Sequence, residues 1–160
     1  MLFRSKSSIW IRRRIPIDDF FVRSGVTTLA RGEIVVAIEL PVPTRRTVAV
    51  HLRRTRRRGH DLAAVTLCCA IDDTGTTRLS YGSVGPRPVL VTDDTGMLAD
   101  PHAPDAAKAA IFERMFAGAS PSKRSMRAGP EYRLAMLRVL GSRAVRTLVE
   151  RIVAERPAEA

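Results

Sequence analysis

The sequence predicts an α+β domain with two layers, in which helices pack on one face of an antiparallel sheet of three to four strands. Segments rich in β-branched residues and separated by Gly, Pro and Asp fill the first part of the chain, and apolar residues at helical spacing fill the last part. Strands that precede helices in this way are typical of an antiparallel sheet with its helices on one side. The 160 residues, of which 45% are hydrophobic, suffice to bury a core.

The N-terminal part of the chain carries the weaker signals. Residues 1–5 show no structural pattern, and residues 16–21 suggest a short helical turn that begins with Pro, followed by a loop at Gly25. Residues 33–40 are β-branched and end before Pro41, which cannot donate to a sheet ladder. We therefore expect a strand over residues 33–40.

Three further segments predict antiparallel strands. Residues 47–53 place Val, Val and Leu on one face and Ala, His and Arg on the other, which predicts a half-buried strand. Residues 62–71 form a longer apolar strand, which ends at the turn signal of residues 72–75. Residues 77–84 supply its hairpin partner.

The C-terminal part has the period of helices. Residues 104–117 place apolar side chains four apart after a Pro and an Asp that suit a first helical turn. A second helix begins at Pro130 and carries one apolar stripe as far as Ile152. Gly141 interrupts this stripe, which weakens the helix but allows a close approach of its neighbours.

The cysteines and histidines do not form a metal-binding pattern. Cys68 and Cys69 are neighbours in an apolar strand, so they point to opposite faces, and we expect both to be buried thiols. The chain has no second pair of cysteines, and the ligand spacing of a zinc or iron–sulfur site is missing. We predict no metal site. No apolar stretch has the length of a membrane span and no signal peptide is evident, which predicts a cytoplasmic protein without a membrane partner.

The net charge of +11 raises a nucleic-acid-binding module as an alternative function. No aromatic residue interleaves the densest basic cluster, residues 53–58, so the stacking platform of a single-strand binder is absent. A solvated basic surface, or an interface to an acidic partner subunit, explains the same charge. Nucleic acid is therefore the less favoured partner.

Three segments in order resemble the C-terminal domain of a known flavoprotein subunit. The segments are residues 17–41, residues 56–65 and the helix start at residues 131–133, the last preceded by the loop of residues 82–88. Together they are similar to the FAD-binding (medium) subunit of the molybdenum hydroxylases, the family of xanthine dehydrogenase and of aerobic carbon monoxide dehydrogenase. The resemblance covers about residues 15 to 152.

The resemblance implies a domain organisation. Residues 1–30 would be the remnant of a preceding FAD-binding domain and its linker, and residues 31–156 would be the C-terminal domain. The family's Gly-rich loops that cradle the FAD pyrophosphate belong to the preceding domain, and no such loop occurs in this sequence. We therefore expect a truncated reading frame, which lacks most of the FAD site and has no enzymatic activity alone.

The resemblance also implies a role in electron transfer. FAD would receive electrons from two [2Fe–2S] centres on a small subunit, which obtain them from a molybdopterin-containing large subunit, and would pass them to an acceptor. Carried over by position, Ile34 and Val35 would lie near the adenine end of FAD. Arg53 would lie where the family often has a Lys close to the isoalloxazine, and this is a departure because a guanidinium is bulkier and cannot be deprotonated.

Each of these residues also has a structural explanation. Ile34 and Val35 suit a strand without any cofactor, and Arg53 suits a solvated basic loop. Asp61 suits a partner of Arg57 or Arg58 that orders a turn, while the Tyr and Arg of residues 132–133 are expected to hold the last helix in place.

No catalytic residue is predicted. His60 stands next to an Asp, but no nucleophile or orienting group accompanies the pair. A third possible function is a non-catalytic domain that docks subunits and binds neither flavin nor nucleic acid.

Overall fold

The computed structural model describes residues 2–6, 9–57 and 61–155, with backbone alone for 2–6, 9 and 10. The described chain divides into two compact units, Met1–Pro43 and Thr44–Ala160, and each is described by itself. Arg58 and His60, for which the sequence suggested a turn contact and an acid–base pair, lie outside the described residues.

The first unit contains two small antiparallel sheets. In one, the order is β2 (Ile9–Arg13), β1 (Leu2–Lys6) and β5 (Glu33–Val35). The other pairs β3 (Phe21–Arg23) with β4 (Val26–Thr27) after the helical turn α1 (Ile17–Phe20). Gly25 forms the tight turn between β3 and β4 with a φ of 72°, a conformation that residues with a Cβ rarely adopt. The predicted helical turn and loop are confirmed.

Two expectations for the first unit are wrong. Residues 1–5 were expected to have no regular structure, but residues 2–6 form β1 because the whole of β2 pairs with them. The strand expected over residues 33–40 extends only to Val35. Val35 lies opposite Leu2, the first residue of β1, so no strand is available to pair with the residues that follow.

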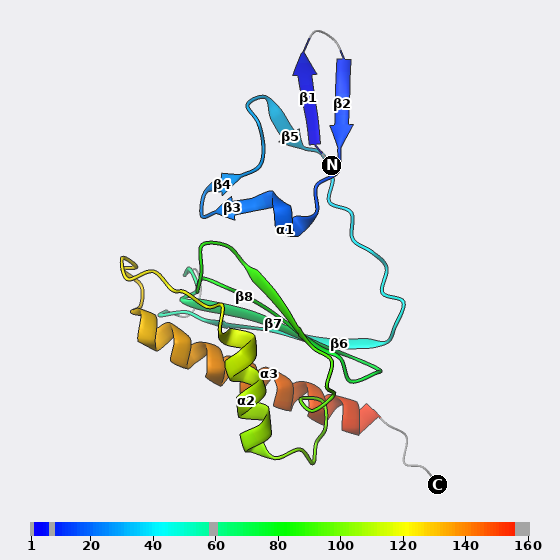
Figure 1. The fold of residues 1–160 in the computed structure, drawn as a ribbon, viewed down its shortest axis with the longest axis vertical. Helices are drawn as coiled ribbons and strands as arrows, with labels where there is room; N and C mark the ends of the chain where they lie inside the picture. Colours follow the sequence, from blue (N-terminus) through cyan, green and yellow to red (C-terminus); the bar gives the residue numbers. More distant parts are fainter. Residues whose placement is uncertain (1, 7–8, 58–60, 156–160) are drawn as a thin grey trace. The chain divides into compact units, whose positions relative to one another are not determined.

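The second unit is a four-stranded antiparallel sheet covered by two helices. Its strands are β6 (Thr47–Arg54), β7 (Val65–Asp72), β8 (Thr77–Gly82) and β9 (Val89–Asp93), and they are adjacent in sequence order. The helices α2 (Asp105–Phe116) and α3 (Pro130–Glu155) lie on the same face of this sheet (Figure 1). This arrangement confirms the predicted α+β fold with two layers.

The core of the second unit lies between the sheet and the helices. Alternate residues of β7 point into it, and all of them are almost completely buried: Val65, Leu67, Cys69 and Ile71. The apolar stripe of α3 covers them: Leu137, Leu140, Ala144 and Leu148. The helix approaches closely at Gly141, which the sequence had indicated as a position of close packing.

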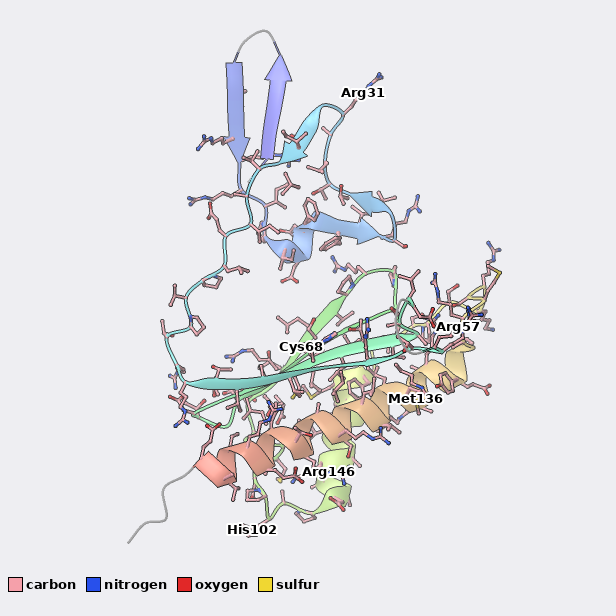
Figure 2. The ribbon with its side chains drawn as sticks, turned by 180° about the vertical axis from the view of Figure 1, so that it is seen from behind. Arg31, Arg57, Cys68, His102, Met136 and Arg146 are labelled. Carbon is pink, nitrogen blue, oxygen red and sulfur yellow. The ribbon has the colours of Figure 1, made fainter. Side chains whose placement is uncertain are left out.

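The other face of the sheet carries small and polar side chains. Across its middle, the register joins His51 to Cys68 and Cys68 to Ser80. Cys69 is buried, but Cys68 is exposed, and Figure 2 shows it on the face turned away from α3. The prediction that the two thiols point to opposite faces is correct, and the prediction that both are buried is wrong for Cys68. No helix of the second unit covers this face, so the apolar character of a strand does not by itself bury every side chain.

Candidate functional site

Arg53 lies near the end of β6, on the face of the sheet that the helices leave open. It is exposed, and its register partner on β7 is Thr66. Alternation along β6 places His51 on the same face, and the Nε2 atom of His51 lies 2.7 Å from Oγ1 of Thr66. Among the described residues, no carboxylate forms an ion pair with Arg53. The guanidinium is therefore available to a group outside this unit.

Small residues lie beside Arg53 on the two neighbouring strands. Thr66 is followed across the sheet by Gly82, and a Cβ added to Gly82 would lie only 3.0 Å from Cγ2 of Thr66. At Thr66 and Gly82 the surface is low, so a planar molecule or a protein backbone could approach the strands closely there, with the His51 ring to one side. This geometry suits the binding of such a group and allows the positive charge of Arg53 to change the electrostatic potential around it.

The loop that follows β6 is ordered by one carboxylate. Oδ2 of Asp61 accepts hydrogen bonds from the backbone N–H of Arg56 at 3.0 Å and of Arg57 at 3.1 Å. The bond from Arg57 is the main cause that lowers the pKa of Asp61 below its ordinary value, and the nearby Arg56 adds to it. Asp61 therefore orders the turn as expected, and among the described residues it does so through the backbone amides of Arg56 and Arg57.

The start of α3 is held by Arg133, as the sequence suggested. This guanidinium is buried and donates to the carbonyl of Ser83, to the carbonyl of Ala128 at 3.2 Å and to Oγ of Ser125. Burial is the main cause that lowers the pKa of Arg133, and the nearby Arg127 lowers it further. All three acceptors are neutral, so Arg133 is a structural link between α3, the end of β8 and the loop before α3.

Tyr132 provides a second link at the same end. Its hydroxyl accepts a hydrogen bond of 2.9 Å from Nε of Arg54, the last residue of β6. Arg53 and Arg54 therefore differ in role, because alternation sends Arg54 towards α3 and Arg53 to the open face. The sequence did not distinguish the two arginines by role. The alternation of β6 is the signal that separates them.

Ile34 and Val35 lie in the first unit, on the edge strand β5. Their register partners on β1 are Phe3 and Leu2, and their side chains are 59% and 46% exposed. The apolar residues that follow, up to Val42, are also exposed. Apolar side chains in such a run are typical of a surface that another domain or ligand covers. The candidate residues thus divide between the two units, with Arg53 in the second.

The described residues contain no cluster of three or more His, Cys, Asp or Glu side chains that could hold a metal ion. None of their helices has the length and hydrophobicity of a membrane span.

The fold matches solved structures. Quinoline 2-oxidoreductase from Pseudomonas putida 86 superposes with a TM-score of 0.70 at 20% identity, over 93% of this chain and 52% of that chain. Carbon monoxide dehydrogenase from Hydrogenophaga pseudoflava has a TM-score of 0.65 at 24% identity, over 84% and 47%. The reconstituted enzyme from Oligotropha carboxidovorans has a TM-score of 0.65 at 25% identity, over 83% and 47%. The chain thus spans about half the length of these chains.

A comparison with curated proteins gives no match. The family of the CO dehydrogenase flavoprotein C-terminal domain matches residues 50–148, which include most of β6, the rest of the sheet, α2 and the larger part of α3. This match confirms the resemblance that the three sequence segments indicated. The chain therefore belongs to the family of the CO dehydrogenase flavoprotein C-terminal domain.

Proposed function

We propose that this chain is part of the FAD-binding subunit of a molybdenum-containing hydroxylase or dehydrogenase, and that it helps to enclose the FAD. The family match over residues 50–148 carries the proposal. In this proposal residues 1–30 are the remnant of a preceding FAD-binding domain and its linker, and residues 31–156 form the C-terminal domain. The chain spans about half the length of the solved chains that it matches, which leaves room in such a protein for a flavin domain.

The proposed partners are a molybdopterin-containing large subunit and a small subunit with [2Fe–2S] centres, acting together in the cytoplasm. When bound, FAD supplies the redox chemistry that passes electrons from the [2Fe–2S] centres to an acceptor. The residues of this chain do not carry out that chemistry. They cover the cofactor and adjust its electrostatic surroundings.

Arg53 is the residue that we propose next to the isoalloxazine. It is exposed on the open face of the sheet, the small residues Thr66 and Gly82 lie beside it, and no described carboxylate forms an ion pair with it. A fixed cation near the flavin stabilises the anionic reduced form, so it raises the reduction potential.

Ile34 and Val35 are the residues that we propose at the adenine end. Their exposed apolar side chains on an edge strand suit the face of an adenine ring, and a strand backbone offers N–H and C=O groups to its edge. About half of each residue stays exposed in its own unit, which supports a contact outside it.

A flavin spectrum after purification and desalting tests the proposal for the whole chain. The chain alone retains little FAD, because no phosphate-binding loop is present, and addition of the preceding flavin domain restores retention. Stoichiometric FAD held tightly by the chain alone would contradict the proposal.

A redox titration of the bound flavin tests Arg53. In the reconstituted subunit, Arg53→Ala lowers the flavin potential and leaves the fold intact, because an exposed change away from the core costs little stability. The matched control is Arg56→Ala, an exposed arginine in the loop three residues later, which changes the potential much less. Equal potentials in the parent and both variants would assign Arg53 to the solvated basic surface.

A further inference from the structure

The charges of the second unit are separated between the two ends of its sheet. The strand register places Thr47, Asp72, Thr77 and Asp93 at one end, and Arg54, Val65, Gly82 and Val89 at the other. Acidic side chains collect at or near the first end: Asp72, Asp73, Asp93, Asp94, Asp100, Asp105, Glu150 and Glu155. We call the second end, where α3 begins, the basic end.

The basic end is formed by two loops and the last residues of β6. Its exposed cations are Arg53, Arg54, Arg56, Arg57, Lys123, Arg124 and Arg127. Figure 2 shows Arg57 at the end of the sheet where α3 begins, away from Arg146 on the outer side of α3. Among the described residues, only Asp61 and Glu131 bring negative charge to this end.

The ion pairs described in the second unit all lie away from the basic end, although single cations elsewhere, such as Arg143 and Arg146, also form none. Five arginines elsewhere pair with carboxylates, in the pairs Arg45–Asp73, Arg46–Glu155, Arg78–Asp72, Arg114–Asp93 and Arg138–Glu113. Within the described part of the chain, the cations of the basic end form no such pair. The positive field of this end is thus not cancelled by its own unit, and it is available to attract an acidic surface.

The loop that carries Lys123, Arg124 and Arg127 is anchored. The backbone N–H of Ser120 donates to the carbonyl of Val84 at 2.7 Å, and Arg133 holds Ser125 and Ala128. A loop fixed at both sides presents its charges without a large further loss of conformational entropy when a partner binds.

Exposed apolar groups accompany these cations. Met126 is 96% exposed between Arg124 and Arg127, and Tyr132 is 41% exposed at the start of α3. Met, Tyr and Arg are the residue types that protein–protein interfaces favour, whereas a single-strand nucleic-acid site requires several stacking aromatics. The composition of the basic end therefore fits a protein surface better than a nucleic acid.

We propose that the basic end docks an acidic surface of the [2Fe–2S] subunit, with Met126 entering an apolar site on that subunit; this inference rests on the proposed function. Arg53, the residue proposed beside the isoalloxazine, lies next to Arg54 at the same end. A [2Fe–2S] subunit docked here brings its electron donor to the side of the flavin, which short-range electron transfer requires. The cations steer the encounter, and Met126 extends the residence time.

Binding of a [2Fe–2S] subunit of a molybdenum hydroxylase tests the docking surface. The full chain and two triple variants are compared at about 0.15 M salt and at higher salt. The loop variant reverses three positive charges of the anchored loop: Lys123→Glu, Arg124→Glu and Arg127→Glu. The helix variant reverses the same number of positive charges on α2 and α3: Lys108→Glu, Arg143→Glu and Arg146→Glu. The loop variant raises Kd at least about tenfold, mainly through slower association, and the helix variant changes it by less than about twofold.

A second variant separates docking from misfolding and from charge alone. Met126→Ala keeps the charge and, at a fully exposed position, leaves thermal unfolding unchanged. It weakens binding through faster dissociation. The docking surface would be overturned if Met126→Ala bound with unchanged Kd and both triple variants lost the same amount of affinity. In that case, binding of the parent chain to the [2Fe–2S] subunit would leave the proposed function standing.

Three other outcomes also overturn the inference. The first is no binding of the [2Fe–2S] subunit by the parent chain, in which case the flavin measurement decides the proposed function separately. The second is retention of duplex DNA near physiological salt that the loop variant abolishes. The third is a complex of two copies of this chain that the loop variant dissociates, since the acidic end of one copy complements the basic end of another.

Discussion

Gly141→Ala places a methyl group where α3 meets the aromatic residues of α2. A Cβ at this position would lie 2.9 Å from Cζ of Phe116, 3.2 Å from its Cε2 and 3.3 Å from Cε1 of Phe112. Carbon atoms at optimal packing are separated by about 3.5 to 4.0 Å. The rings must therefore move by several tenths of an ångström to admit the methyl group.

The surroundings of the two rings oppose this movement. Phe112 and Phe116 are stacked with an interplanar angle of 7°, and Phe116 meets the Tyr81 ring edge to face at a centroid distance of 5.5 Å. The hydroxyl of Tyr81 donates to the carbonyl of Met115 at 3.1 Å, which fixes that ring in turn. Overpacking of a core costs about 1 to 3 kcal/mol. Helix propensity returns about 1 kcal/mol when Ala replaces Gly. We expect a net loss of up to about 2 kcal/mol in the free energy of unfolding.

Urea unfolding followed by circular dichroism measures this change. Ser142→Ala is the matched control, because Ser142 is the next residue of α3 and is exposed, so propensity alone acts and stability rises slightly. In a Phe116→Leu background the aromatic edge is removed, and Gly141→Ala becomes neutral or stabilising. A Gly141→Ala protein that is about 1 kcal/mol more stable than the parent with Phe116 present, as helix propensity alone predicts, would refute the argument from close approach.

Three further predictions concern single side chains of the second unit. Arg133→Met lowers the free energy of unfolding by about 3 kcal/mol, because three acceptors lose a charged donor at roughly 1 kcal/mol each. Urea titration measures this loss. A loss smaller than that of the exposed control Arg143→Met would contradict the prediction. The pKa of Asp72 is lowered from 3.8 to about 2, first by the hydroxyl of Thr74. Its contribution to stability is therefore complete above about pH 4 and is lost as the pH falls through about 2, and Asp72→Asn removes this acid dependence. One thiol of the native chain reacts with a thiol reagent at pH 8 and the second reacts only after unfolding, because burial raises the pKa of Cys69 to about 12; two fast equivalents in the native state would contradict the structure.

Local patterns were sufficient to predict three of the four strands and both helices of the second unit, but they did not predict β9. The strand of residues 47–53 alternates strictly, the hairpin after it has a Gly at its turn, and the two helices carry apolar stripes. Consecutive patterns predict elements that are compatible with one another, and the residues of a short stretch of chain are enough to specify each strand, turn or helix. The structure changes their ends by a few residues at most, because helix and strand ends depend on packing.

The errors arise where the outcome depends on a distant partner. The β-branched run after Gly32 has the composition of a long strand, but only the three residues opposite β1 can pair. Cys68 lies in an apolar strand and is nevertheless exposed, since burial depends on which face the helices cover. A local pattern does not contain either fact. Arg53 and Arg54 are a different case, because the local alternation of β6 already separates Arg53, which faces the open side, from Arg54, which donates to Tyr132.

The net charge shows how arrangement changes the functional conclusion. A total of +11 spread evenly over a surface favours a polyanion as partner. The antiparallel register, however, brings Asp72 and Asp93 to one end of the sheet and the cationic end of β6 to the other. The acidic end neutralises its own arginines, while the basic end retains its charge beside an exposed Met126. A localised, anchored and partly apolar positive surface selects a partner by shape as well as by charge, and this favours a subunit over a polyanion.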